Sequence, residues 1–71
     1  MQENLSLYHI FYIVSRTGNI SQAAKELYIS QPAISRAIKK LEDNLDTILF
    51  KRSSRGVILT PDGQLLYEKV K

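Results

Sequence analysis

Two predicted helices follow one another with almost no chain between them, and this spacing constrains the fold more than any other feature of the sequence. The first helix is expected to end at Leu27, and the second to begin at Ser30, a residue type that favours the N-cap position. Only about Tyr28 and Ile29 remain for the connection. Helices joined by so short a turn must meet at a steep angle rather than lie side by side. Because no glycine stands near Tyr28, the turn is expected to be made by a bulky residue with an ordinary backbone conformation.

The starts and inner faces of these two helices are predicted from capping residues and from apolar spacing. Ser21 is expected to cap the earlier helix, because its hydroxyl can accept a hydrogen bond from a free amide of the first turn. Pro32 lies in the first turn of the later helix, where its missing N–H leaves no bond unmade. Apolar residues at three- and four-residue spacing form the inner faces, and they are Ala24 and Leu27 in the earlier helix and Ile34, Ala37, Ile38, Leu41 and Leu45 in the later one.

A longer amphipathic helix is predicted upstream, from about Leu5 to Arg16. Gly18 is expected to close it in the left-handed conformation that glycine adopts easily. The repeat of apolar residues every three to four positions indicates one broad buried face, made of Leu7, Ile10, Phe11, Ile13 and Val14.

From Ile48 onward the pattern changes to short strands. Residues 48–52 and 57–59 are strand-like, and the polar turn at residues 53–56 contains a glycine. Thr60 then opens a last helix as its N-cap, with a proline at the first helical position. This helix carries the apolar Leu65, Leu66 and Val70. Because no terminator follows, we expect the chain to be the front part of a longer protein.

Three helices with a tight turn between the second and third, followed by a small hairpin, are the outline of a winged helix-turn-helix. We therefore predict a mostly α fold, with a three-helix core and a two-stranded β wing. The domain is expected to cover residues 1–59, with the helix-turn-helix motif at about residues 20–39, and residues 60–71 to begin a linker helix. Ala24 suits the close crossing of the two motif helices.

Composition excludes several classes of protein. The chain has no cysteine, so neither a disulfide nor a thiolate zinc site can hold the fold together. His9 is the only histidine and has no nucleophile motif around it, so we expect no metal site and no enzyme. No apolar run approaches the roughly 20 residues that cross a bilayer, and the first residues do not resemble a signal peptide. We expect a cytoplasmic domain that uses no cofactor.

The net charge of +3 is a weak pointer to a polyanionic partner, and the placement of polar residues says more. Core-facing positions leave one outer face on the helix that begins at Ser30, and this face carries Gln31, Pro32, Ser35, Arg36 and Lys39. Such side chains can reach base edges when a helix lies in the DNA major groove. The same residues could form an ordinary hydrated surface, but the preceding helix, the short turn and the wing favour DNA binding.

Further contacts are predicted for the wing and for the earlier motif helix. Arg55 lies at the predicted tip of the hairpin, and arginine suits a narrow minor groove. Lys51 and Arg52 lie on the strand that leads to the tip, where they could contact DNA, face the core or pair with acids. Ser21 and Gln22 could offer donors to a phosphate, or serve only to cap their helix.

At these residues the chain resembles the LysR-type transcriptional regulators. The likeness runs from about Leu5 to the end of the chain and is carried by GNISQAAKEL at 18–27, SQPAISRAI at 30–38, LE at 41–42, LFKR at 49–52, RG at 55–56 and LTPDG at 59–63. The resemblance implies that Arg55 is the minor-groove arginine of the wing and that the base-reading residues are Gln31, Pro32, Ser35 and Arg36. One departure is Asp46, which stands where the family usually has a glycine. Asp tolerates a left-handed backbone, so this helix end is expected to be slightly strained.

The resemblance also implies the partners. Regulators of this family join the DNA-binding domain by a long helix to a domain that binds a small-molecule effector, and that domain is absent from this chain. Their linker helices pair subunits into dimers or tetramers, a role that would fall here to Leu65, Leu66 and Val70, although packing onto their own domain needs the same residues. The expected DNA is an interrupted, A·T-rich palindrome, with half-sites a multiple of roughly 34 to 36 Å apart.

Two other readings of the fold stay open at this point. A winged helix can serve protein contacts alone, since a fold does not fix a function. Such a protein would usually expose apolar anchors on the helix that begins at Ser30, whereas Gln31, Ser35, Arg36 and Lys39 are polar or basic. Another family of winged-helix regulators would change the effector but not the DNA chemistry.

Overall fold

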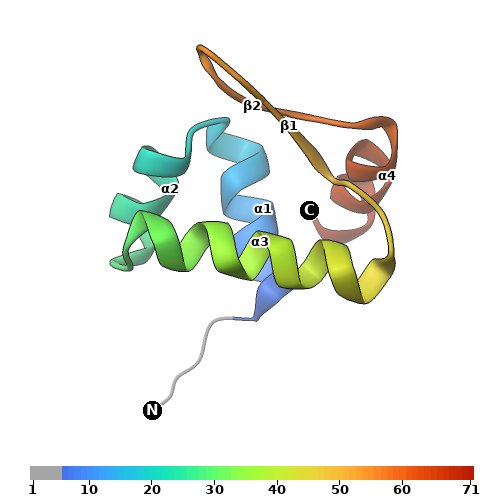
Figure 1. The fold of residues 1–71 in the computed structure, drawn as a ribbon, viewed down its shortest axis with the longest axis horizontal. Coiled ribbons are helices and arrows are strands. Elements are labelled where there is room, and N and C mark those ends of the chain that lie inside the picture. The colour runs from blue at the N-terminus through green and yellow to red at the C-terminus, as the bar shows by residue number, and fades with distance from the viewer. Residues whose placement is uncertain (1–5) are drawn as a thin grey trace.

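The computed structural model describes residues 6–71 and has the predicted architecture (Figure 1). In chain order its elements are α1 (Leu7–Thr17), α2 (Ile20–Leu27), α3 (Gln31–Leu45), β1 (Phe50–Ser53), β2 (Gly56–Leu59) and α4 (Pro61–Val70). Figure 1 shows α3 running across the molecule, with α2 beside its N-terminal end, α4 near its C-terminal end, and the hairpin extending over α1. The mostly α winged helix-turn-helix is confirmed. Residues 1–5, which include the predicted helix start at Leu5, lie outside the described residues.

The first helix is closed at both ends by its neighbouring residues. Ser6 is the N-cap, and its hydroxyl accepts a hydrogen bond of 3.0 Å from the amide of His9. Gly18 adopts the predicted left-handed conformation, with φ 66°, and its amide donates to the carbonyl oxygen of Val14 over 2.8 Å. Only two residues, Gly18 and Asn19, therefore separate the first helix from the second.

The predicted N-cap of α2 is wrong by two residues. Asn19, not Ser21, has the extended backbone of a cap, and its side-chain oxygen accepts from the amide of Gln22 over 3.0 Å. Ser21 lies inside the first turn and is exposed. Both residue types favour this position, but Asn19 directly follows the left-handed Gly18, so the chain has already turned before Ser21 is reached.

The turn between α2 and α3 also differs from the prediction. Tyr28 has a left-handed backbone, with φ 57° and ψ 38°, instead of an ordinary one. This conformation lets the amide of Ile29 donate to the carbonyl oxygen of Ala24 over 3.1 Å, which closes α2. The Tyr28 side chain is 95% exposed and packs on nothing that would oppose this backbone. A helix that must end within one residue requires the left-handed conformation even without a glycine.

The ends of α3 follow the sequence more closely. Ser30 is the N-cap and accepts from the amide of Ala33 over 3.2 Å. Asp46 closes the helix in the expected left-handed conformation, with φ 55°. Leu45, predicted on the inner face, is exposed instead. Leu41 is the last buried residue of α3, so the final turn of this helix extends past the core.

The core lies between α1, α3 and the segment that precedes β1. Its most deeply buried large side chains are Phe11 and Val14 of α1, Ile34 and Leu41 of α3, and Leu49. From α2 only two small residues, Ala23 and Ala24, are buried, which allows α2 to approach the other two helices closely. Because the apolar set comes from sequentially distant elements, its burial fixes where α3 and the hairpin lie.

The hairpin is antiparallel, and its turn is shorter than predicted. Phe50 pairs with Leu59, Arg52 with Val57, and Ser53 with Gly56, so only residues 54–55 remain in the turn. Residues 48 and 49, predicted as strand, precede β1. The Phe50 ring packs on Phe11 with 5.3 Å between ring centroids, and the amide of Val57 donates to the carbonyl oxygen of Gly18 over 3.1 Å.

Glu42 of α3 holds the start of the hairpin, a role that its sequence position did not suggest. One carboxylate oxygen, Oε2, accepts from the amides of Leu49, over 2.8 Å, and Phe50, over 3.3 Å. Leu49 is almost fully buried, so its amide has no ready access to water. This carboxylate therefore satisfies two backbone donors that would otherwise be left without partners.

Glu42→Ala is expected to lower the free energy of unfolding by about 1 to 3 kcal/mol, because both amides lose their acceptor. Glu42→Gln keeps a side-chain oxygen and should lose less. Urea denaturation of both variants, followed by circular dichroism, measures the difference. The control is Asp43→Ala, which removes the neighbouring exposed acid. Equal losses for Glu42→Ala and Asp43→Ala would contradict the anchoring role of Glu42.

The last helix packs against α1 through an aromatic pair. Tyr12 and Tyr67 stack with 5.8 Å between ring centroids and 10° between ring planes. Thr60 caps α4 as predicted, accepting from the amide of Gly63 over 3.0 Å, and its hydroxyl donates to the carbonyl oxygen of Ile48 over 2.6 Å.

Near the end of the chain the hydrogen bond and charge of Lys71 hold the pKa of the exposed Glu68 below its ordinary value. Among residues 6–71, no helix has the length and apolar character needed to span a membrane.

Candidate nucleic-acid interface

The outer face of α3 presents a polar and basic surface. Gln31, Pro32, Arg36 and Lys39 are exposed, and Ser35 is half-buried. Ile34 and Ile38 on the same helix are buried in the core, so the direction of the polar face is fixed by packing on the opposite side. The proline at the second helical position leaves no unmade hydrogen bond there. The residues predicted to read bases therefore lie on one helical surface.

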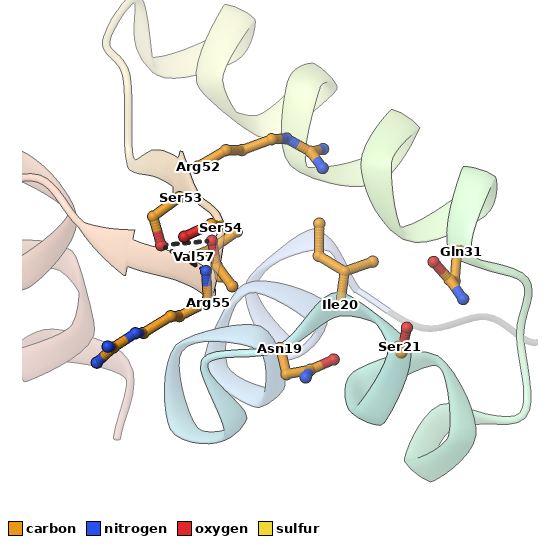
Figure 2. Close-up of a pocket in the computed structure, with 10 residues that line it drawn as sticks. Asn19, Ile20, Ser21, Gln31, Arg52, Ser53, Ser54, Arg55 and Val57 are labelled. Atoms are coloured by element: carbon orange, nitrogen blue, oxygen red, sulfur yellow. Dashed lines mark hydrogen bonds between the residues drawn. The ribbon is translucent and has the colours of Figure 1, made fainter.

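A hollow lies between this face and the hairpin (Figure 2). Three segments contribute to its lining: the start of α2, the start of α3 and the hairpin. Of the predicted contact residues it brings together Ser21, Gln31, Arg52 and Arg55. Its remaining lining residues are Asn19, Ile20, Ser53, Ser54, Gly56 and Val57. The hollow is open and largely polar, so it suits the charged sugar-phosphate backbone of a nucleic acid better than an apolar ligand.

The two arginines of the hairpin point in different directions. In Figure 2 the Arg52 side chain reaches from β1 toward α3, whereas Arg55 extends from the turn away from α3. Nη2 of Arg52 donates to the Ser35 hydroxyl over 3.2 Å. Of the roles left open for Arg52, the structure shows a polar contact with α3 rather than an ion pair with an acid. Lys51 is exposed on β1, between Phe50 and Arg52.

Within the part of the chain that the structure describes, ion pairing leaves most of the basic residues near this surface free. Lys39 lies 3.1 Å from Asp43 in an exposed pair one turn apart, and such pairs contribute little to stability. Among residues 6–71, Arg36, Lys51 and Arg55 form no ion pair with an acid. Their charges are therefore available to an anionic partner.

At the start of α2 the two predicted residues differ in what they can offer. Ser21 is exposed at the edge of the hollow, so its hydroxyl is accessible. Gln22 is exposed as well but does not line the hollow, and its amide is already bonded to Asn19. The free donor at Gln22 is therefore its side chain, not its backbone.

The residues predicted to pair subunits lie on α4 and have unequal exposure. Leu65 is 65% exposed, whereas Leu66 and Val70 are partly buried against the core of their own domain. The exposed Leu65 suits pairing with a second subunit, whereas Leu66 and Val70 suit packing onto their own domain. His9 is exposed on α1, and among residues 6–71 no three histidine or acidic side chains are grouped closely enough to hold a metal ion.

Sequence reasoning missed the contacts that join the hairpin to the rest of the molecule. Glu42 and the pair formed by Arg52 and Ser35 were not predicted in these roles, and neither was Asn19 as the cap of α2. A local signal existed only for Asn19, which is a good cap residue. The other contacts join residues 7 to 17 positions apart in the chain, so they depend on how the hairpin folds back over α3.

Comparison with known proteins gives a consistent result. A family model described as bacterial regulatory helix-turn-helix protein, lysR family, matches residues 5–64. The HTH-type transcriptional regulator PerR of Escherichia coli (strain K12) is 47% identical over 66 residues, which cover 93% of this chain and 22% of that protein. The HTH-type transcriptional regulator GltR of Bacillus subtilis (strain 168) is 44% identical over 63 residues, covering 89% of this chain and 21% of that protein. The chain thus spans about a fifth of the length of these curated relatives.

Solved structures agree with these relatives. The crystal structure of a CbnR_DBD–DNA complex matches with a TM-score of 0.88 and 37% identity, covering 96% of this chain and 78% of that chain. The crystal structure of a BenM_DBD/catB site 1 DNA complex also has a TM-score of 0.88, with 35% identity over 96% of this chain and 76% of that chain. The likeness therefore extends to proteins whose structures were determined together with DNA.

Proposed function

Because the chain belongs to the lysR family of bacterial regulatory helix-turn-helix proteins, we propose that it is the sequence-specific DNA-binding part of a transcriptional regulator. The observation that carries this proposal is the polar face of α3, which lies beside an arginine-bearing hairpin across one open hollow. Relatives named as transcriptional regulators, and matching structures that contain DNA, support it. The chain acts by binding, with no catalytic or cofactor chemistry of its own, and it does so in the cytoplasm.

The outer face of α3 lies in the major groove. Arg36 can donate two hydrogen bonds to O6 and N7 of a guanine, and Gln31 can bond to the N6 and N7 edge of an adenine. Ser35 can bond to base edges, and the ring of Pro32 can contact a thymine methyl group. These four residues supply the base readout, because they are the polar or small side chains at the exposed start of the helix.

The hairpin and the helix ends contact the backbone and the minor groove. Arg55, at the exposed turn, enters the minor groove next to the α3 site, where a narrow A·T-rich groove has a stronger negative potential. Lys39 and Lys51 neutralise phosphates, Arg52 adds charge on the face of the wing that is turned toward α3, and Ser21 and Gln22 donate to a phosphate at the start of α2. These contacts give affinity and register rather than sequence preference.

In the longer protein, subunits pair through the linker helix that α4 begins, with Leu65, Leu66 and Val70 contributing to the pairing. A homodimer or homotetramer presents two α3 helices to the half-sites of an interrupted palindrome, a multiple of roughly 34 to 36 Å apart. A further domain outside this chain binds the small-molecule effector that controls the regulator. The DNA-binding domain covers residues 1–59, and residues 60–71 begin the linker.

Selection of bound duplexes from a randomised pool, followed by methylation interference, tests the two grooves separately. Methyl groups on guanine N7 lie in the major groove and those on adenine N3 in the minor groove. Arg36→Ala is expected to cost about 1 to 3 kcal/mol of preference at one base pair and to remove interference by a guanine N7. Arg55→Ala should remove interference by adenine N3 and leave the guanine signal in place.

The matched control is Lys69→Ala, because Lys69 is exposed on α4, outside the proposed interface. It should leave both interference patterns unchanged. If Arg36→Ala and Lys69→Ala gave the same selected sequences and the same interference, α3 would not be the base-reading helix.

A further inference from the structure

We propose that Arg52 is a positioning residue that makes the Ser35 hydroxyl a hydrogen-bond donor toward DNA, so that the wing helps to determine which base α3 selects. This inference rests on the proposed function and assigns Arg52 a role in specificity, beyond the charge it adds to the wing. It starts from the hydrogen bond of 3.2 Å between Arg52 Nη2 and Ser35 Oγ, which joins β1 to α3 across 17 positions of the chain.

The direction of the Arg52 side chain is set by the strand that carries it. Successive side chains of a strand point to opposite faces, so Phe50 and Arg52 share one face and Lys51 points the other way. Phe50 faces inward, because its ring packs on the buried Phe11. Arg52 therefore also points toward the body of the domain, and at its position along the hairpin it meets α3, as Figure 2 shows.

The hairpin is held firmly enough to make this contact specific. Its base is fixed by the two hydrogen bonds that Glu42 accepts. Its second strand is fixed by the bond from the Val57 amide to the carbonyl oxygen of Gly18, and Val57 is the residue that pairs with Arg52. Arg52 thus extends from an anchored part of the wing and not from its free tip.

The chemistry at Ser35 follows from which partner donates. A guanidinium can only donate, so the Ser35 oxygen accepts and its proton remains to be given elsewhere. Two part-buried hydroxyls on α1 behave differently, because they donate their protons within their own helix. Ser15 donates to the carbonyl oxygen of Phe11 over 2.8 Å, and Thr17 donates to that of Ile13 over 2.9 Å. Ser35 has no acceptor for its proton among residues 6–71, so the proton is free for a base.

A hydroxyl in this state favours some base edges over others. It can donate to guanine O6 or N7, adenine N7 or thymine O4, which are the acceptors of the major groove. The amino groups of cytosine N4 and adenine N6 are donors, and they would have to use the second lone pair of an oxygen that already accepts from a cation, which is the less favourable arrangement. Without Arg52 the hydroxyl could rotate and accept from these groups, so one source of discrimination would disappear.

The test compares duplexes selected from a randomised pool by the protein and by the variants Arg52→Met, Arg52→Lys and Ser35→Ala. Methionine keeps much of the apolar stem of Arg52 but has no donor, whereas lysine keeps a donor and the charge. Arg52→Met and Ser35→Ala are expected to lose preference at the same base pair by about two- to tenfold each, the size of one net hydrogen bond. Combining the two should cost little more than either alone, and Arg52→Lys should restore part of the preference.

Lys51→Met is the matched control, because it removes the same charge from the neighbouring strand position. It should weaken binding to all sequences alike and lower the slope of log affinity against log salt by about 0.9, the value for one phosphate contact. If Arg52→Met behaved like Lys51→Met, or if its effect simply added to that of Ser35→Ala, Arg52 would be a phosphate contact and the inference would be wrong. A wild-type protein that selected no sequence at all would instead overturn the proposed function, and this inference with it.

Discussion

Phe11→Ala is expected to lower the free energy of unfolding by about 3 to 5 kcal/mol, the usual cost of emptying a buried aromatic site. Phe11 is fully buried in α1 and supports the ring of Phe50, so its removal leaves a cavity between the helical core and the hairpin. A domain of this size has about 4 to 11 kcal/mol of stability in total. The variant should therefore be largely destabilised, with a melting temperature lower by roughly 15 °C or more.

Tyr8→Ala provides the matched comparison, because it removes an aromatic ring from the exposed side of the same helix. A surface substitution of this kind should change stability by no more than about 0.5 kcal/mol. Thermal melting followed by circular dichroism gives both values. Similar shifts for Phe11→Ala and Tyr8→Ala would show that the core does not centre on Phe11.

Gly56→Ala is expected to cost about 2 to 4 kcal/mol, through backbone strain and the loss of a hydrogen bond. Gly56 has φ 134°, a conformation that residues with a side chain rarely adopt. A Cβ atom at this position would lie 2.3 Å from the carbonyl oxygen of Gly18. The hairpin would have to move away from the end of α1 and give up the bond between the Val57 amide and that oxygen.

Hydrogen exchange distinguishes local from global effects of Gly56→Ala. If the wing alone detaches, the amide of Val57 loses protection while those of the buried α3 residues keep it. Binding to the minor groove through Arg55 should then weaken even where the helices remain folded. Ser54→Ala, in the exposed turn of the same hairpin, should leave the protection of the Val57 amide unchanged. Unchanged protection of Val57 in Gly56→Ala would mean that the contact with Gly18 does not hold the hairpin.

Features determined by neighbouring residues were predicted well from the sequence. Gly18, Ser30 and Thr60 end or begin helices as expected, because a cap depends on a side chain and on amides within a few residues of it. The choice between Asn19 and Ser21 went wrong for a related reason. Both can cap a helix, and only the position of the preceding turn decides between them.

Features that depend on tertiary contacts could not be predicted in this way. Tyr28 is left-handed because α2 has to end abruptly before α3 begins, a requirement that outweighs the preference of its side chain. Leu45 fits the apolar spacing of α3 but lies beyond the point where the core ends. The role of Glu42 has no local signal in the sequence, because it depends on the hairpin bringing two backbone amides to the Glu42 carboxylate.

In the candidate site, too, features set by local spacing could be predicted and features set by tertiary contacts could not. The exposed face of α3 was predictable, because helical spacing separates Gln31 and Arg36 from the buried Ile34. The link between Arg52 and Ser35 was not, since it needs the twist and length of a hairpin whose position is set by Phe50 and Val57. The roles of the individual residues on DNA remain predictions.

The most direct test of the central claim is a titration of this protein with random and A·T-rich palindromic duplexes over a series of salt concentrations. With three or more phosphates neutralised, log affinity should fall against log salt with a slope of about −2.7 or steeper, at about −0.9 per phosphate. The palindromic set should also contain sequences bound more tightly than the random set at the same salt concentration. Absence of binding at low salt by a folded sample, or equal affinity for every duplex, would contradict the claim that α3 and the wing read DNA.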